Sequence, residues 1–133
     1  MNYLKYLNIK HDYQTNNCLS LIASIYENEL HIPWIEERVL FNNFVINDIK
    51  DLRKIPISAI YNLKNWSKIS LTEIQEFDII IYTRLNKLSH FSMYVGNLKI
   101  LDLRENFSSV LRHFNDTQRD NIEGIMRHKQ LVT

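Results

Sequence analysis

Two strand-like runs joined by a turn make up the stretch His90-Phe-Ser-Met-Tyr-Val-Gly-Asn-Leu-Lys-Ile-Leu-Asp102. β-Branched and aromatic residues favour strands, and Gly96-Asn97 between the runs is typical of a tight hairpin turn. If the chain reverses there, residues close to His90 and Asp102 pair across neighbouring strands. The stretch therefore predicts an antiparallel hairpin that brings an imidazole and a carboxylate within reach of each other.

Similar short runs surround this hairpin in the second half of the chain. They cover Phe77–Tyr82, Ser109–Phe114 and Glu123–Arg127, with turn residues between them. In the first half of the chain, by contrast, apolar residues recur at helical spacing. Helices first and strands second predict an α+β domain, with N-terminal helices packed on an antiparallel sheet.

The clearest helix signal begins at the only cysteine. The apolar residues that form one helix face at i, i+3, i+4, i+7 and i+8 are Cys18, Leu21, Ile22, Ile25 and Tyr26. Residues 15–17 are Thr-Asn-Asn, which all cap helices, so we expect the helix to start within a residue or two of the thiol. His31-Ile-Pro33 ends the pattern.

The middle of the chain carries weaker signals. Trp34 to Ile49, through Val45 and Ile46, suggests a helix that Asp48 to Lys54 could extend with a charged face. Pro56 breaks it. Residues 57–63 are predicted as a short further helix and residues 65–68 as a loop.

Length and charge bound the function. A chain of 133 residues with 45% hydrophobic content is expected to form one domain, residues 1–133. Sixteen basic and fifteen acidic residues leave no global field to recruit nucleic acid or an anionic membrane. The longest apolar run, Ile79–Tyr82, is too short to span a bilayer, so no membrane insertion is expected. The amino terminus lacks the apolar core of a secretory signal.

Neither the basic residues near Trp66 nor the remaining histidines predict a second functional site. The basic residues near Trp66 are interrupted by Asp48 and Asp51 and are interpreted as a solvated face; they are Lys50, Arg53, Lys54, Lys64 and Lys68. The remaining histidines are scattered, without metal-ligand spacing; they are His11, His31, His113 and His128. We therefore expect neither a metal nor a cofactor.

Cys18 cannot form an internal disulfide, because it is the only cysteine. Taken alone it is most simply a packed core thiol. A thiol attacks an amide carbonyl as the thiolate, which both a helix amino terminus and a neighbouring imidazolium favour. Cys18 begins a helix, and His90 on a strand could supply the imidazolium while Asp102 fixes its tautomer. This is the logic of a nucleophile, base and orienting carboxylate.

The stretch from His90 to Asp102 resembles the histidine-strand-turn-strand block of NlpC-like cysteine peptidases. In that family the third polar catalytic position follows the histidine by about twelve residues, which here is Asp102. Asn17-Cys18-Leu19-Ser20 resembles the family's cysteine-helix start, usually Asp-Cys-Ser-Gly. Leu71-Thr-Glu-Ile-Gln-Glu-Phe-Asp-Ile-Ile-Ile81 resembles the approach to its first core strand, with Glu76-Phe77-Asp78 in place of Pro-Gly-Asp. These differences are similar to those of the branch found in tail-tip proteins of long-tailed phages.

The resemblance implies a papain-like fold with Cys18 as nucleophile, His90 as general base and then acid, and Asp102 as the group that orients His90. It also implies that the Cys18 backbone amide helps to bind the oxyanion, and that Tyr13 lines the same cleft. The implied activity is cleavage of amide bonds in peptidoglycan stem peptides, in a virion tail tip acting at the host cell wall alongside other tail proteins. Two alternatives stay open: a non-catalytic assembly module of a phage tail with a vestigial triad, and acyl transfer by the same triad.

Overall fold

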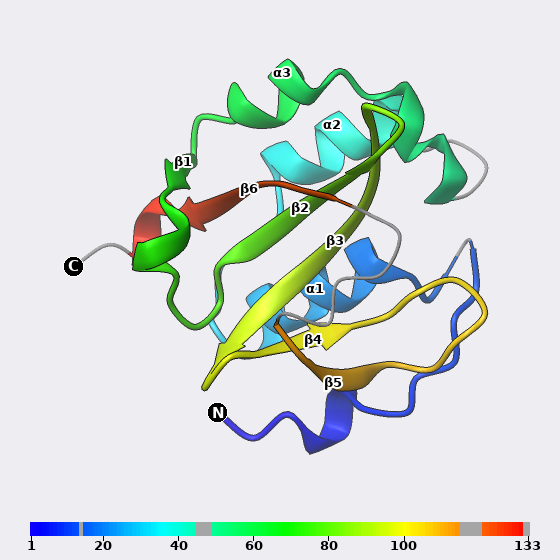
Figure 1. Cartoon of the computed structure of the whole chain (residues 1–133), viewed down its shortest axis with the longest axis vertical. Helices are drawn as coiled ribbons and strands as arrows, with labels where there is room; N and C mark the ends of the chain where they lie inside the picture. Colours follow the sequence, from blue (N-terminus) through cyan, green and yellow to red (C-terminus); the bar gives the residue numbers. More distant parts are fainter. Residues whose placement is uncertain (14, 45–48, 115–120, 132–133) are drawn as a thin grey trace.

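The computed structural model describes residues 1–13, 15–44, 49–114 and 121–131. Its central feature is a six-stranded antiparallel sheet in the order β1-β6-β2-β3-β4-β5 (Figure 1). The strands are β1 (Trp66–Ile69), β2 (Ile79–Arg84), β3 (Lys87–Gly96), β4 (Lys99–Asp102), β5 (Val110–His113) and β6 (Asn121–His128). The predicted α+β class with an antiparallel sheet is confirmed.

Helices precede most of the sheet in sequence and pack on one of its faces. The α-helices are α1 (Cys18–Asn28), α2 (Glu36–Phe44) and α3 (Ile57–Tyr61), and the 3-10 helices are η1 (Leu4–Tyr6), η2 (Ile49–Lys54), η3 (Leu71–Glu73) and η4 (Lys129–Leu131). The apolar face of α1, including Ile22 and Ile25, joins Ile81, Phe91 and Met93 of the sheet in the main core. Burial of this face holds α1 against β3. Figure 1 shows α1 behind this strand.

The opposite sheet face carries a smaller core of Ile80, Tyr82, Tyr94, Ile100, Phe114 and Ile125. Residues 79–83 of β2 are consequently buried on both faces. A strand covered on both sides tolerates a continuous apolar run instead of alternation. This explains why Ile79–Tyr82 is the most apolar part of the sequence.

Two-residue turns connect the three consecutive strands β2, β3 and β4. Leu85 and Asn86 turn between β2 and β3 with φ of 52° and 62°, and Asn97 and Leu98 turn between β3 and β4 with φ of 52° and 60°. Paired positive φ angles are typical of type I′ hairpins, which suit the twist of the strands. The predicted hairpin is confirmed, but its turn lies one residue later than Gly96-Asn97, because Gly96 still pairs with Lys99.

Two sequence predictions in the middle of the chain need correction. The loop predicted over residues 65–68 is wrong for Trp66–Ile69, which form β1 against the carboxyl-terminal half of β6. The pairing partner comes from the other end of the sheet-forming sequence, and the Trp66 ring is buried against Tyr26 and Glu37 of the helices as well as His128. The predicted helix from Trp34 is shorter, since α2 spans Glu36–Phe44 and Ile49–Lys54 form the 3-10 helix η2. Val45, Ile46 and Asp48 lie outside the described residues.

Candidate active site

Cys18 is the first residue of α1, and the residue before it fixes that position. Asn17 has extended backbone angles, and its side-chain oxygen accepts hydrogen bonds from the N–H groups of Leu19 and Ser20, both at 3.1 Å. Ser20 Oγ in turn accepts from the Asn17 N–H at 2.8 Å. This reciprocal capping box satisfies orphan donors of the first turn. The predicted helix start is confirmed, and the thiol lies at the positive end of the helix dipole.

His90 is held by β3 next to a local irregularity. Tyr82 of β2 pairs with His90, whereas the next residue, Thr83, pairs with Leu88. Ser89 is therefore an extra residue on β3, which is the definition of a β-bulge. The His90 ring packs 5.5 Å from the Tyr82 ring, measured between centroids, and only 7% of the residue is exposed.

Asp102 lies at the end of β4 and contacts His90 directly. Met93 of β3 pairs with Leu101 of β4, and both His90 and Asp102 are an odd number of residues from that pair. Their side chains therefore project from the same face of the sheet. His90 Nε2 and Asp102 Oδ1 are 2.5 Å apart, and Asp102 is 1% exposed. The predicted contact between the imidazole and the carboxylate is thus present.

The thiol completes a chain of three side chains. Because Asp102 occupies Nε2 of His90, the ring nitrogen left for Cys18 is Nδ1. Burial lowers the pKa of His90, but hydrogen bonds to Asp102 and to Cys18 outweigh it and raise the pKa to about 9. The ring is accordingly protonated near neutral pH. A charged imidazolium next to a cysteine at a helix amino terminus is the environment that favours a thiolate.

Two arginines, neither of them a predicted site residue, lie against the other oxygen of Asp102. Arg104 Nε donates to Asp102 Oδ2 at 2.8 Å, and Arg112 Nε lies 3.2 Å from the same oxygen as an ion pair. Burial raises the pKa of Asp102, but the His90 hydrogen bond and the Arg104 charge outweigh it and lower the pKa. Arg112 reaches this oxygen because β5 pairs with β4: Asp102 pairs with Val110, and Arg112, two residues on, shares its face. The sequence carries no local signal for that pairing.

The Cys18–His90 pair opens onto a cleft of about 920 Å³. Its walls come from η2, the β2–β3 hairpin and the segment after β4. Tyr13 is not among the described residues that line it, so the position that the resemblance implies for Tyr13 is wrong. Instead, the Tyr13 hydroxyl donates to the side chain of Glu105, and its ring packs edge-on against His11, with centroids 4.9 Å apart. Glu105 and His11 both line the cleft, so Tyr13 contacts two residues of its wall without lining it.

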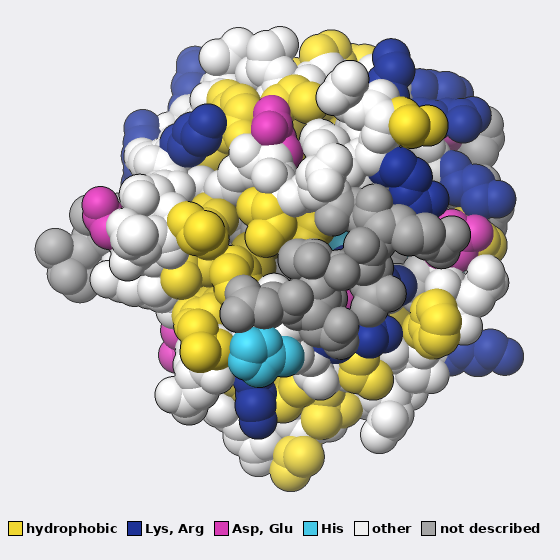
Figure 2. Space-filling view, viewed as in Figure 1, with side chains coloured by type: hydrophobic (Ala, Val, Ile, Leu, Met, Phe, Trp, Pro, Cys, Tyr) yellow, Lys and Arg dark blue, Asp and Glu magenta, His cyan; other side chains and the backbone are white. Residues whose placement is uncertain are grey.

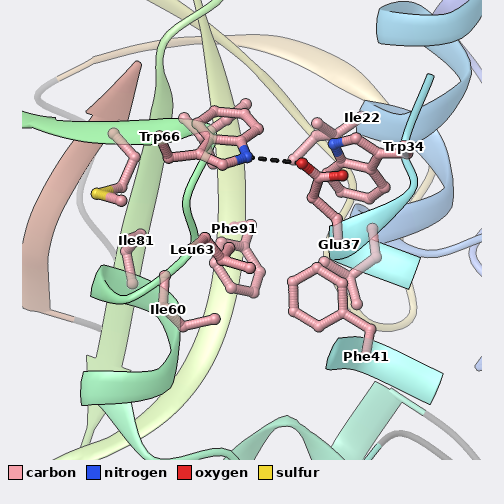
Figure 3. A pocket seen from close by; sticks show the side chains of 12 residues that line it. Ile22, Trp34, Glu37, Phe41, Ile60, Leu63, Trp66, Ile81 and Phe91 are labelled. Carbon is pink, nitrogen blue, oxygen red and sulfur yellow. Dashed lines mark hydrogen bonds between the residues drawn. The ribbon is translucent and has the colours of Figure 1, made fainter. Parts of the chain in front are cut away.

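A second, smaller cavity of about 30 Å³ lies within the main core (Figure 3). Its lining is apolar except for Glu37, whose carboxylate accepts from Trp66 Nε1 at 2.8 Å. Burial raises the pKa of Glu37, although the Trp66 hydrogen bond opposes it. None of Cys18, His90 and Asp102 lines this cavity. We therefore assign it to core packing and place the candidate chemistry in the open cleft.

Other kinds of site find little support in the described part of the chain. Within it, no group of three or more histidine, cysteine, aspartate or glutamate residues is placed to hold a metal ion. No helix among the described residues is long and apolar enough to cross a bilayer. Neither the family models nor the curated proteins compared with the sequence give a match. The resemblance to NlpC-like peptidases accordingly rests on the residues quoted above.

Proposed function

We propose that the protein is a cysteine hydrolase that cleaves amide bonds, with Cys18 as nucleophile, His90 as acid and base, and Asp102 as the orienting group. The observation that carries the proposal is the continuous contact from the Cys18 thiol through His90 to Asp102, with Cys18 and His90 lining a cleft. Each member has a different local environment, and together they supply a nucleophile, a proton carrier and a fixed counter-charge.

The proposed reaction has two steps. The Cys18 thiolate attacks the amide carbonyl carbon, the carbon–nitrogen bond breaks, and His90 gives its proton to the departing amine. Water then attacks the thioester while His90 takes a proton from it, which releases a carboxylic acid and restores Cys18. The Cys18 N–H, for which the described residues show no acceptor, is available for the oxyanion in both steps.

The finer assignment rests on the resemblance described in the sequence. We propose a papain-like fold of the NlpC type, stem peptides of peptidoglycan as substrate, and a place in a phage tail tip acting at the host cell wall with other tail proteins. Support comes from the helix that presents Cys18 and from the hairpin that carries His90 and Asp102. These two residues are twelve positions apart in the sequence.

Purified protein incubated with peptidoglycan fragments tests the proposal. We expect release of new amino groups, and loss of that release in the variants Cys18→Ala and His90→Gln. Both variants must keep the far-ultraviolet circular dichroism spectrum of the parent. No release by the parent protein, or equal release by Cys18→Ala, would reject the hydrolase. Transfer of the acyl group to added hydroxylamine in preference to water would identify an acyltransferase instead.

One observation favours a second candidate, a non-catalytic assembly module. Cys18 is only 3% exposed and belongs to the main core, as an inert packing thiol would. Alkylation by iodoacetamide separates the two candidates, because it reports thiolate character directly. Fast alkylation of Cys18 below neutral pH, slowed by His90→Gln, supports the hydrolase. Alkylation only after unfolding supports the assembly module.

A further inference from the structure

The cleft above Cys18 is strongly basic although the chain as a whole is nearly neutral. The cationic residues that line it, here called the basic rim, are Lys50, Arg53, Arg84, Lys87, Arg104 and Arg112. Among the described lining residues Glu105 is the only carboxylate. The whole chain has sixteen basic and fifteen acidic residues. The excess of positive charge in the cleft is therefore local and does not follow from the overall composition.

Members of the basic rim differ in the contacts that their side chains make with the rest of the protein. Arg104 and Arg112 face Asp102, and Lys50 Nζ lies 4.8 Å from the centre of the Tyr13 ring. Arg53 on η2 and Lys87 at the start of β3 are exposed and make no ion pair with any described residue. Figure 2 shows lysine and arginine side chains gathered at the upper right, over η2 and the tip of the β2–β3 hairpin. These two residues are therefore available to a ligand.

A polar atom in the cleft wall also lacks a partner. Ser89 Oγ, on the bulge next to His90, is buried and forms no hydrogen bond with the described residues. A buried hydroxyl without a partner costs free energy, which a bound polar group would recover. The wall next to the candidate base thus offers a hydrogen bond to something that enters the cleft.

A concave site lined by one sign of charge concentrates ligands of the opposite sign, since its protein walls focus the field. Guanidinium and ammonium groups both bind carboxylates with charge-assisted hydrogen bonds. In the proposed reaction the Cys18 thiolate attacks a carbonyl carbon, and a peptide provides such a carbon in its amide bonds. Phe107 is the one phenylalanine, tyrosine or tryptophan among the described lining residues, so the cleft lacks the stacking surface of a single-stranded nucleic acid site.

We propose that the cleft selects acidic peptides, in which carboxylates flank the amide bond presented to Cys18 and are bound by Arg53 and Lys87. This specificity rests on the proposed hydrolase and defines its substrate class. The basic rim attracts the peptide, Arg53 and Lys87 bind its carboxylates, and Ser89 forms a hydrogen bond near the reacting carbonyl.

Matched peptides test the proposal in the full-length chain. Fluorescence-quenched peptides that carry either glutamate or glutamine around the cleaved bond would be compared at low and high salt. We expect kcat/KM to be at least tenfold higher for the glutamate peptides at low salt, and the preference to shrink as salt screens the rim. The double variant Arg53→Gln/Lys87→Gln should lower kcat/KM for glutamate peptides by roughly tenfold and change the glutamine peptides little.

Lys64→Gln is the matched control, because Lys64 is exposed and lies outside the cleft. It should leave both kinds of peptide unchanged. Equal turnover of the glutamate and glutamine peptides by the parent protein would overturn the proposed specificity while leaving the hydrolase intact. So would an equal effect of the double variant on both kinds of peptide.

Binding separates failure of the specificity from failure of the hydrolase. In the Cys18→Ala background, fluorescence anisotropy should show tighter binding of the glutamate peptides, lost with Arg53→Gln/Lys87→Gln. If the parent cleaves neither peptide but this binding pattern is found, the hydrolase fails and the acidic-peptide site stands. A short single-stranded DNA of equal charge that binds more tightly than the glutamate peptides would overturn the proposed ligand class.

Discussion

Two buried aspartates in this protein have similar surroundings and different consequences. Asp78, just before β2, is fully buried and accepts hydrogen bonds from Arg127 Nε and Nη2, each at 2.8 Å. Asp102, at the end of β4, is 1% exposed and accepts from Arg104 and from His90. Each carboxylate is paired, as buried charges must be.

The difference lies in the second partner and in what that partner touches. Arg127 stays charged at any ordinary pH, and its Nη2 also donates to the carbonyl of Glu73 at 2.7 Å, which ties η3 to the sheet. His90 can gain and lose a proton, and its other side meets Cys18 and the cleft. A buried carboxylate with an arginine is therefore a structural clamp by default. It becomes a candidate catalytic group when a titratable ring connects it to a nucleophile.

The sharpest test of this difference is Asp102→Asn. The amide keeps the shape of the carboxylate but no longer favours a charged His90, so we expect kcat/KM to fall by about 10³–10⁴-fold, as for other triads of this kind. Steady-state kinetics on a cleaved peptide would measure it. Activity within a few-fold of the parent would indicate that Asp102, like Asp78, has a structural role only.

Asp78→Asn should show the converse behaviour. It leaves Arg127 buried without a counter-charge, which typically costs about 3–5 kcal/mol of stability. Urea denaturation followed by tryptophan fluorescence would measure the loss. The fraction that remains folded should keep its kcat/KM within a few-fold. A larger effect on kcat/KM than on stability would contradict the assignment of Asp78 to structure alone.

The two ion pairs should also differ in their dependence on pH. His90 has a pKa raised from 6.5 to about 9 in the folded state, so its protonation stabilises the fold. That contribution is complete below pH 6.5 and is lost as pH rises through about 9, and kcat/KM should fall over the same upper range. Denaturation curves between pH 6 and 10 should show this decline in the parent and in Asp78→Asn. Its persistence in His90→Gln would assign the decline to another group.

Arg104→Gln should lower kcat/KM less than Asp102→Asn does. The guanidinium donates to Asp102 Oδ2 and helps to keep the pKa of Asp102 low. We expect a loss of about tenfold in kcat/KM, the equivalent of one charged hydrogen bond, with partial rescue by Arg104→Lys. The upper limb of the pH profile should move toward higher pH, because loss of the neighbouring guanidinium charge leaves His90 more strongly held as the cation. An unchanged pH profile would make Arg104 a packing residue.

The smallest effect is expected for Tyr13→Phe. The substitution removes the hydroxyl that donates to Glu105 at an exposed position, which is worth less than about 1 kcal/mol. We expect KM to change by less than about fivefold and kcat to stay constant. A large fall in kcat would indicate that Tyr13 contacts the substrate.

Local sequence was sufficient for the elements that carry the candidate site. The spacing of Cys18, Leu21, Ile22 and Ile25 defines the face of α1, and Asn17 and Ser20 define its start, because capping and helical periodicity involve only near neighbours. The hairpin between β3 and β4 was predictable for the same reason. Its register was not, because it depends on the irregularity between Tyr94 and Gly96 that puts His90 and Asp102 on one face.

Only the tertiary structure decided what these elements enclose. β1 exists because β6 pairs with it, and Arg112 reaches Asp102 because β5 pairs with β4. Lys50 and Arg53, interpreted from sequence as part of a solvated face, meet Arg84 and Lys87 at one cleft. Helix starts and tight turns depend on interactions within a few residues, so the sequence determined them. Strand partners and the charge of a cleft depend on segments far apart in the chain, which folding alone brings together.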